Sequence, residues 1–368
     1  MIAYLKCILK GLLCFSFITF SNCESNTNTK DLVDINKQYQ KYLYDIDNIY
    51  NLNILDKYEA KSTIYSIYSF INEIQSNTSS YYNPFVSEWI TKERRFAGDN
   101  PDAQYFSFFI DANALYEVEV NSDNVFFMEV TSYKNQNKGN VISKSITYAK
   151  NGKTKFTLSA NKNYNPYFQI DDKDYLVMIR YYKKDRMLLS EKPKLVCSNS
   201  PLQKKVVSKQ FITLFSSELF SSIVNSSKFL TNQMKEKPNG YVDISGSNPY
   251  VGNLFPAKNN VYNGAFIYLP NDNSYLSIKG TINKQYYSMF VFYNEWWATP
   301  YTKVESGTSY INAKDLITDT EGNYEIIIST KPLNLPNNII TNGLSKGVFS
   351  IRSLNLEFDD PQIELKEL

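Results

Sequence analysis

The sequence predicts a mainly β protein with helical additions: two related antiparallel strand-rich domains, an N-terminal pair of helices and a helical connector. Three observations lead to this prediction. Short aromatic and β-branched runs separated by turn residues dominate from Pro101 onward. Apolar residues recur every three or four positions near the start and in the middle of the chain. The strand-rich segments on the two sides of the middle region also match each other in order.

Residues 1–22 are typical of a secretion signal. Lys6 and Lys10 precede an apolar run over residues 11–20, which is too short to span a bilayer. The run ends at Phe20-Ser21-Asn22-Cys23, which resembles a bacterial lipobox. We therefore expect lipidation of Cys23 and a membrane-anchored protein on the periplasmic or surface face of the cell envelope. The alternative is an ordinary signal cleaved nearby, which gives a secreted protein with a plain Cys23 thiol.

Composition excludes several classes of function. Removing residues 1–22 takes away two lysines and no acids, so 39 basic and 37 acidic residues become 37 and 37. A neutral chain gives no basis for binding nucleic acid. The chain has no histidine, which excludes histidine-based triads and histidine-ligated zinc, and we expect no cofactor. Of four cysteines, Cys7 and Cys14 leave with the signal, so no disulfide framework exists and Cys197 is expected to pack as a small apolar residue.

Two regions have helical periodicity. Residues 23–80 are expected to hold a polar tether and two helices, over Leu32–Ile49 and around Ile64–Ile74, with a turn near residues 51–57. Residues 199–238 are expected to form the connector, because apolar residues repeat at every fourth position from Val207 to Ile223. Pro238-Asn239-Gly240 ends this helix.

Residues 81–198 and 239–368 are the two expected strand-rich domains. The strands of the first are Tyr105–Ile110, Tyr116–Val120, Val125–Tyr133, Lys155–Ser159 and Tyr175–Tyr182. Those of the second are Ala265–Leu269, Tyr275–Lys279, Tyr286–Tyr293, Tyr324–Ser329 and Gly347–Leu356. Asn151-Gly152 is a strong hairpin signal, and Thr320–Asn323 is a weaker one.

The two domains match at five places in the same order, which favours an internal duplication over chance similarity of β-rich segments. The matched pairs are Tyr116 with Tyr275, residues 126–130 with 287–291, residues 151–159 with 321–329, Pro166 with Pro336, and Ile179-Arg180 with Ile351-Arg352.

A series of short motifs runs through residues 262–361. They are Tyr262–Gly264, Phe292–Trp296, Thr308-Ser309 with Asn312, Asp319 with Gly322, Pro336-Asn337, Thr341–Gly343, Gly347 and Ile351-Arg352. In this order they resemble the bacterial "domain of unknown function 1214" family, and residues 98–105 are similar to the amino-terminal signature of the same proteins. The resemblance implies jelly-roll-like β-sandwiches and no established activity. Leu344 stands where relatives commonly have histidine, and Ile339 where they often have tryptophan, so roles resting on that histidine do not carry over.

Residues 98–102, Gly-Asp-Asn-Pro-Asp, concentrate oxygen atoms ahead of a strand. One interpretation is an Asx-type turn in which Asp99 or Asn100 caps backbone amides. The other is a ligand-binding edge formed by Asp99, Asn100 and Asp102. Calcium needs about six to eight oxygens. The carboxylates at 171–174 and 359–360 have no spacing that completes a cage, so no metal site is predicted.

Arg180 and Arg352 sit in strands with mostly apolar neighbours. Buried arginine requires a carboxylate partner, for which Glu295, Asp319 and Asp102 are candidates. Alternatively, Arg352 presents its planar fork to an acidic ligand.

The pair Trp296-Trp297 follows a strand that is apolar on both faces and ends near Asn294. We expect Trp296 to plug the open end of the sandwich, as the family position implies, and Trp297 to lie at the rim. There Trp297 either covers core edges or offers a stacking platform for a sugar ring.

Three functions remain open from the sequence. The first is an envelope lipoprotein that binds a glycan or a small apolar ligand through Asp99, Asn100, Asp102, Asn294, Trp296, Trp297 and Arg352, without catalysis. The second is an envelope hydrolase or lyase using Asp99, Asp102 and Asp319 as paired carboxylates. The third is a structural or adhesive surface protein. Gly343–Gly347 matches G-x-S-x-G, but Ser345 lacks a histidine base and a following helix, so we expect a tight loop instead.

Overall fold

The computed structural model describes residues 34–368 except 50–51, 79, 82, 137–138, 149–151, 184–189, 199–206, 245–253, 256, 258–259, 285–286, 302–307 and 355–360. The signal, Cys23 and Asp359-Asp360 lie outside the described residues. The described part forms two β-sandwiches and three helices, so the predicted fold class is confirmed.

The N-terminal helices are α2 (Ile35–Asp47) and α3 (Ile54–Asn77), which agrees with the predicted helical pair. Each begins at a side-chain cap: Asp34 accepts a hydrogen bond from the backbone N–H of Asn36, and Asn53 accepts one from Asp56. The connector contains α4 (Lys209–Lys235), which is capped by Ser208 and ends before Pro238. None of the described helices is long and apolar enough to cross a membrane.

The first sandwich packs a five-stranded sheet against a four-stranded sheet. The larger sheet has the order β1 (Ser87–Glu88), β2 (Ala103–Phe109), β8 (Asp174–Lys183), β4 (Val125–Gln136) and β5 (Gly139–Tyr148). The smaller sheet has the order β7 (Phe168–Gln169), β6 (Lys153–Ser159), β3 (Tyr116–Asn121) and β9 (Lys194–Cys197). Phe106, Val118, Phe156 and Ile179 contribute to the apolar core between these sheets, and Cys197 packs against it.

The second sandwich has the same construction. Its larger sheet has the order β10 (Tyr241–Asp243), β11 (Asn260–Tyr268), β17 (Lys346–Leu354), β13 (Ser288–Tyr293) and β14 (Tyr310–Asn312). Its smaller sheet has the order β16 (Asn338–Ile340), β15 (Asn323–Ser329), β12 (Ser274–Thr281) and β18 (Gln362–Glu367). All six residues of β13 are buried, which confirms that this strand is apolar on both faces.

The strand orders of the two sandwiches are identical after a shift of nine strands, because β1-β2-β8-β4-β5 corresponds to β10-β11-β17-β13-β14 and β7-β6-β3-β9 to β16-β15-β12-β18. Even the parallel pair β6–β7 has its counterpart in β15–β16. The sequence matches noted above fall on or beside corresponding strands. Arg180 in β8 thus occupies the place that Arg352 occupies in β17.

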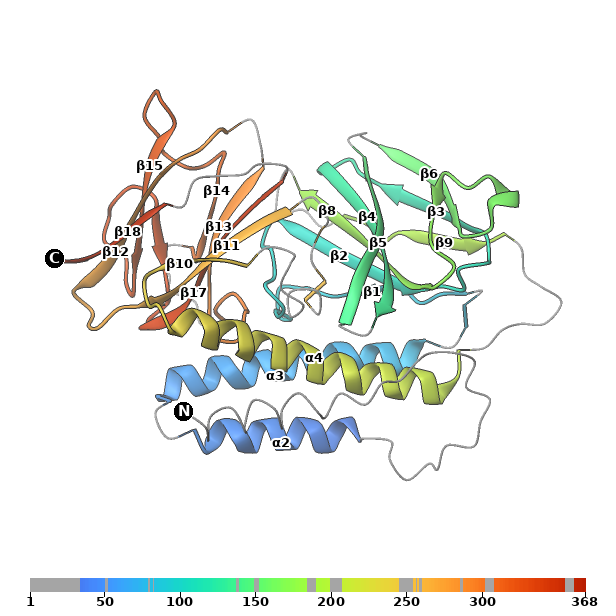
Figure 1. Cartoon of the computed structure of the whole chain (residues 1–368), viewed down its shortest axis with the longest axis horizontal. Coiled ribbons are helices and arrows are strands. Elements are labelled where there is room, and N and C mark those ends of the chain that lie inside the picture. Colours follow the sequence, from blue (N-terminus) through green and yellow to red (C-terminus); the bar gives the residue numbers. More distant parts are fainter. Residues whose placement is uncertain are drawn as a thin grey trace, which may run out of the picture. The chain divides into compact units, whose positions relative to one another are not determined.

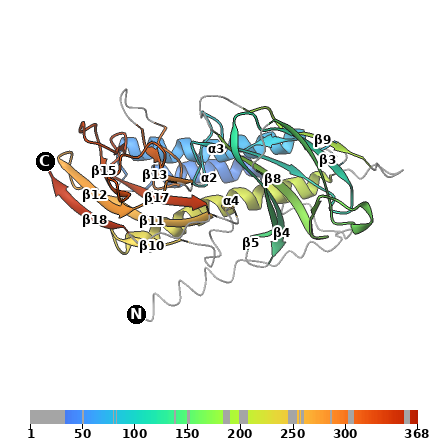
Figure 2. The same ribbon diagram turned by 90° about the horizontal axis from the view of Figure 1, so that it is seen from above.

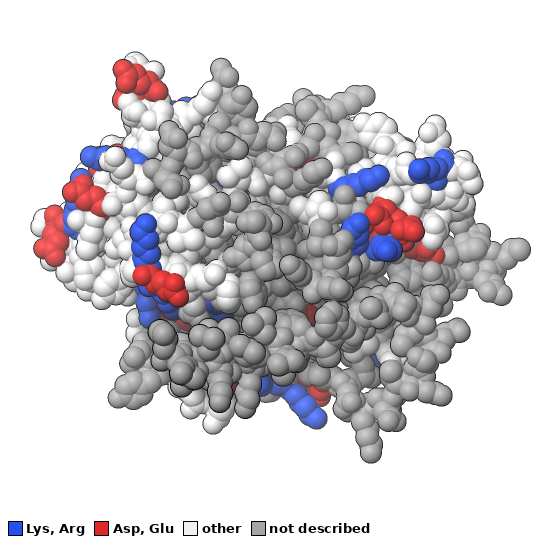
Figure 3. Space-filling model, viewed as in Figure 1, with Lys and Arg blue, Asp and Glu red and all other residues white. Residues whose placement is uncertain are grey.

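The helices lie along one side of both sandwiches (Figure 1). Helix α4 contacts each of them: Phe215 packs edge-on against Phe109 of β2, with ring centroids 4.9 Å apart, whereas Leu230 and Met234 join the core on the outer side of β11, β13 and β17. Seen from above, α4 extends from the second sandwich toward the first (Figure 2). On the face in Figure 3, the charged side chains lie in small groups that contain both signs.

Candidate functional site

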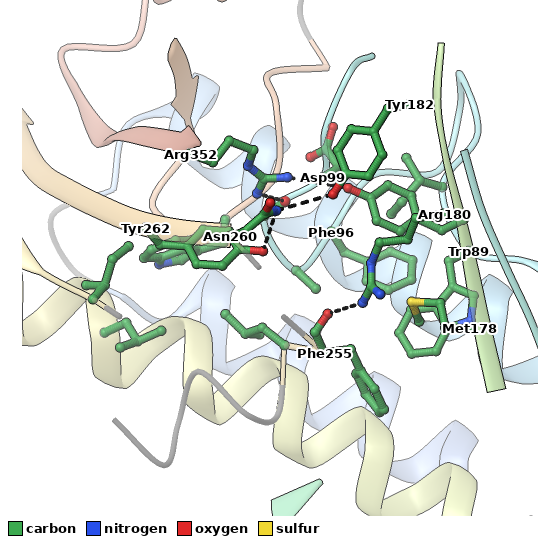
Figure 4. A pocket seen from close by; sticks show the side chains of 18 residues that line it. Trp89, Phe96, Asp99, Met178, Arg180, Tyr182, Phe255, Asn260, Tyr262 and Arg352 are labelled. Carbon is green, nitrogen blue, oxygen red and sulfur yellow. Dashed lines mark hydrogen bonds between the residues drawn. The ribbon is translucent and has the colours of Figure 1, made fainter. Parts of the chain in front are cut away.

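A cavity of about 60 Å³ lies where the two sandwiches and the helical layer meet (Figure 4). The first sandwich contributes Tyr105, Met178, Arg180 and Tyr182, and the second contributes Asn260, Tyr262, Trp297 and Arg352. Apolar side chains from α4 and the flanking segments, including Leu230, Leu254 and Phe255, complete much of the wall. The cavity therefore joins a few buried polar groups to a largely apolar lining, as small-molecule sites commonly do.

Arg180 is held in place by a full set of partners. Glu129 lies directly opposite it in the β4–β8 ladder, and Glu129 Oε2 is 3.9 Å from Arg180 Nη1. The guanidinium also donates to Thr131 Oγ1 at 3.0 Å, and to Tyr133 Oη and the Phe255 carbonyl at 2.5 and 2.6 Å. Burial alone would lower the pKa of Arg180, but Tyr133 and Glu129 outweigh it and keep this pKa above its ordinary value. Arg180 thus carries a neutralised, structural charge.

Arg352 is buried to a similar degree but lacks a carboxylate partner. Its cross-strand neighbour in β13 is Met289, and no carboxylate of the described residues lies within 4.0 Å of its guanidinium. Nη2 donates to the Gly98 carbonyl at 2.6 Å, Nη1 lies 3.4 Å from Tyr105 Oη, and Nε has no hydrogen-bond partner in the described part of the chain. The Tyr262 ring lies against the guanidinium, 5.4 Å from Cζ to the ring centroid. Among the described residues, Arg352 is therefore a cation without a direct ion pair, which the Asp99 carboxylate attracts only from beyond 4.0 Å, and its Nε has no acceptor.

Asn260 links the tyrosines of the two sandwiches. Its Nδ2 donates to Tyr182 Oη at 3.2 Å and to Tyr262 Oη at 3.0 Å, whereas its Oδ1 is shielded from solvent and finds no partner among the residues that the structure describes. Burial raises the pKa of Tyr105 and Tyr182 above the ordinary phenol value, so both keep their protons at neutral pH.

Asp99 is the carboxylate in the cavity lining, and Thr299 satisfies it. Thr299 donates its backbone N–H to Oδ1 at 2.8 Å and its hydroxyl to Oδ2 at 2.7 Å. Burial raises the pKa of Asp99 despite these bonds. Its backbone carbonyl accepts a hydrogen bond from Tyr293 Oη at 2.8 Å. Asp99 therefore ties the turn at residues 98–102 to the second sandwich and does not neutralise Arg352 directly.

Three of the seven predicted ligand residues, Asp99, Trp297 and Arg352, line this cavity. Asn100 and Asp102 do not. Asn100 Oδ1 accepts the backbone N–H of Asp102 at 3.0 Å, which confirms the Asx-type turn at Asn100, and Asp102 accepts a hydrogen bond from Asn312 Nδ2.

Asn294 closes the turn after β13. Its Oδ1 accepts the backbone N–H groups of Trp296 at 2.9 Å and Ala298 at 3.2 Å, and its Nδ2 donates to Glu59 and Thr63 of α3. Asn294 is thus a structural residue outside the cavity lining.

The two tryptophans leave this turn in different directions. Trp296 joins the core of the helical layer, where Lys228 Nζ of α4 lies 4.9 Å from its ring centroid. Trp297 has φ of +60°, donates from Nε1 to Thr231 of α4 at 3.0 Å, and stacks on Tyr293 with centroids 5.9 Å apart. The rim position predicted for Trp297 is wrong: the left-handed turn directs the ring onto α4, and 4% of the residue is exposed.

The predicted convergence of three aspartates is also wrong. Asp319 lies in the turn before β15, where its Oδ1 accepts the backbone N–H groups of Glu321 and Asn323 at 2.9 Å each, and it does not line the cavity. Ser345 is likewise outside the lining. Among the described residues, no three His, Cys, Asp or Glu side chains gather as a metal site would require.

The carboxylate partners predicted for the two arginines are wrong as well. Glu295 pairs instead with Lys235 at 3.1 Å and Lys346 at 3.8 Å. Sequence reasoning missed Glu129, Asn260 and the tyrosines of the cavity. One signal was present, because a tyrosine faces each arginine across the ladder, Tyr105 opposite Arg180 and Tyr262 opposite Arg352.

No family model and no curated protein matches the chain. Among solved structures, it is similar to an uncharacterised protein from Burkholderia cenocepacia, with a TM-score of 0.75 and 12% identity over 91% of this chain and 96% of that one. A protein from Vibrio parahaemolyticus matches with a TM-score of 0.48 and 11% identity over 91% of this chain and 100% of that one. The first of these likenesses shows that the two-sandwich fold recurs in a bacterial protein.

Proposed function

We propose that this chain is a non-catalytic receptor of the bacterial cell envelope, tethered by lipid at Cys23, which binds a small molecule in the cavity between its two sandwiches. One observation carries this proposal: both sandwiches contribute polar groups to one cavity, and two of these groups, Arg352 Nε and Asn260 Oδ1, have no hydrogen-bond partner among the described residues. Buried polar atoms are rarely left unpaired unless something else satisfies them.

The size of the cavity favours a small ligand over a glycan. A buried water needs about 10–15 Å³ of such volume, so 60 Å³ accommodates about four to six non-hydrogen atoms. A monosaccharide has about twice that number. The burial of both tryptophans also removes the exposed stacking platform on which the glycan hypothesis depended.

The competing functions have less support. The hydrolase hypothesis needs paired carboxylates, but Asp319 caps a turn outside the cavity and the carboxylate of Asp99 accepts hydrogen bonds from Thr299. A purely adhesive role leaves the polar cavity unexplained. The matching strand orders support an origin of the two halves by duplication, with Arg352 free to bind a ligand and Arg180 kept for structure.

Filling the cavity should abolish binding. We expect at least one molecule from a library of polar compounds with four to six non-hydrogen atoms to raise the melting temperature of the mature protein by about 3 °C, since a ligand at a hundred times its Kd adds about 2.7 kcal/mol. The Leu254→Trp variant places an indole in the cavity and should lose this shift. Leu335→Trp, at an exposed position, is the matched control and should keep it. Binding that survives in Leu254→Trp, or a library without a single binder, contradicts the proposed site.

The tether has a separate test in cells. Cys23→Ser should move the protein from the membrane fraction to the soluble fraction and abolish incorporation of labelled palmitate. Cys197→Ser removes a cysteine of the first sandwich and should change neither result. Labelling that persists in Cys23→Ser would overturn the anchoring proposal.

A further inference from the structure

The two arginines of the cavity occupy equivalent places but have different surroundings. In the first sandwich, Glu129 faces Arg180 across the β4–β8 ladder. In the second, Met289 faces Arg352 across the β13–β17 ladder, so a thioether replaces the carboxylate. On the opposite neighbouring strand, both sandwiches have a tyrosine: Tyr105 of β2 faces Arg180, and Tyr262 of β11 faces Arg352. The second sandwich therefore keeps the cation but has no carboxylate facing it across the ladder, and Asp99 attracts it only from beyond ion-pair distance.

An unneutralised buried guanidinium calls for an anion from outside the chain. Removing a charge from water is costly unless an opposite charge compensates it. Arg352 is 6% exposed, and the phenol groups around it are neutral donors and acceptors that do not cancel its charge. Its Nε is without a hydrogen-bond partner among the described residues, and the planar fork of arginine matches the two oxygens of a carboxylate.

A second polar atom narrows the chemistry of the ligand. Asn260 Oδ1 is an acceptor without a partner in the described ranges, and the Nδ2 of the same amide donates to Tyr262, whose ring lies against Arg352. A ligand that reaches both groups must carry an anion at one end and a hydrogen-bond donor beside it. Its size is limited by the 60 Å³ of the cavity, which leaves room for about one or two carbon atoms beyond the carboxylate.

We infer that the cavity selects a small hydroxycarboxylate of two or three carbons, whose carboxylate is bound by Arg352 and whose hydroxyl donates to Asn260. This inference rests on the proposed function and names the class of its ligand. The surrounding Tyr182, Trp297 and Leu254 side chains exclude larger acids.

Calorimetric titration of the full mature protein with four probes tests the inference. Glycolate and lactate should bind. Acetate, which lacks the hydroxyl, should bind about tenfold more weakly than glycolate. Glycolamide, which lacks the charge, should bind at least about a hundredfold more weakly than glycolate. Arg352→Gln should weaken glycolate binding about a hundredfold, and Asn260→Ala should abolish the preference for glycolate over acetate while leaving acetate binding unchanged.

Met289→Glu is the sharpest variant, because it copies into the second sandwich the carboxylate that Glu129 supplies in the first. It should fold, neutralise Arg352 and abolish glycolate binding. Arg352→Lys keeps the charge and removes Nε. It should weaken the binding of glycolate more than the binding of neutral probes the size of acetamide. This variant replaces Met289→Glu in the test if Met289→Glu does not fold.

The outcomes separate the two levels of the proposal. Glycolamide binding as tightly as glycolate, or glycolate binding unchanged in Arg352→Gln, overturns the anionic ligand and leaves the cavity receptor standing. Equal binding of acetate and glycolate overturns the role of the hydroxyl. If none of the four probes binds while another library compound does, the ligand class is wrong and the receptor is right.

Discussion

Replacing Arg180 by methionine is expected to lower the free energy of unfolding by about 3–5 kcal/mol. Methionine keeps much of the bulk but leaves Glu129, which is fully buried, without its cation 3.9 Å away. It also removes the donors to Thr131, Tyr133 and the Phe255 carbonyl, three groups that the guanidinium joins across the cavity wall. Urea unfolding followed by tryptophan fluorescence measures the loss.

Two further variants show whether the uncompensated charge is the cause. Arg180→Met combined with Glu129→Leu removes both charges and should recover about half of the lost stability, because an apolar pair is tolerated where a lone charge is not. Lys155→Met breaks the ion pair of Lys155 with Glu119 on the smaller sheet, 3.2 Å in length, where the lysine side chain is 70% exposed, and should leave the unfolding midpoint unchanged. A loss below about 1 kcal/mol in Arg180→Met would show that Glu129 needs no cation.

The Gly347→Ala variant is expected to destabilise the protein by about 3 kcal/mol, at the upper end of the usual cost of overpacking. A Cβ atom at Gly347 would lie 2.3 Å from the carbonyl oxygen of Tyr293 and 2.4 Å from Phe292 Cζ. The first of these is a backbone atom of the adjacent strand β13, so it cannot move aside without shifting the sheet. The melting temperature and the urea midpoint should both fall.

A glycine at which a Cβ atom would make only an ordinary van der Waals contact provides the matched control. Gly152 has φ of +93°, and a Cβ there would meet no described atom closer than 3.9 Å, so Gly152→Ala should cost about 1 kcal/mol from backbone conformation alone. Adding Phe292→Leu to Gly347→Ala should restore part of the loss by removing the ring contact. Equal losses at Gly347 and Gly152 would mean that the close approach of the strands is not what requires glycine at 347.

Local sequence patterns predicted the elements of the fold well. The caps at Asp34, Asn53 and Ser208 are adjacent to helices whose apolar period is visible in the sequence, and Pro238 ends the last helix as expected. The order of matched strands in the two domains also survives in the structure, because each strand keeps its turn residues and its alternation.

The cavity was harder to predict, because it depends on how distant segments meet. Arg352 was found from its charge in an apolar strand and Asp99 from the oxygen-rich turn at residues 98–102, but no local pattern pairs Glu129 with Arg180, which depends on the register of β4 against β8. That register shifts at the start of β4, between Val125 and Phe127, so counting along the sequence places the wrong residue opposite the arginine. Trp297 was misplaced for a similar reason, since a left-handed residue reverses the direction that strand alternation predicts.

Helix α4 has a mechanical consequence for any molecule that enters the cavity. A helix of 27 residues is about 40 Å long and resists bending, and this one is fixed at one end by Phe215 against Phe109 and at the other by Met234 in the second sandwich. A hinge motion that separates the two sandwiches would break one of these contacts of α4. A ligand is therefore expected to enter and leave through small local movements of the cavity wall. We expect its exchange to be slow and to occur without hinge motion of the two sandwiches.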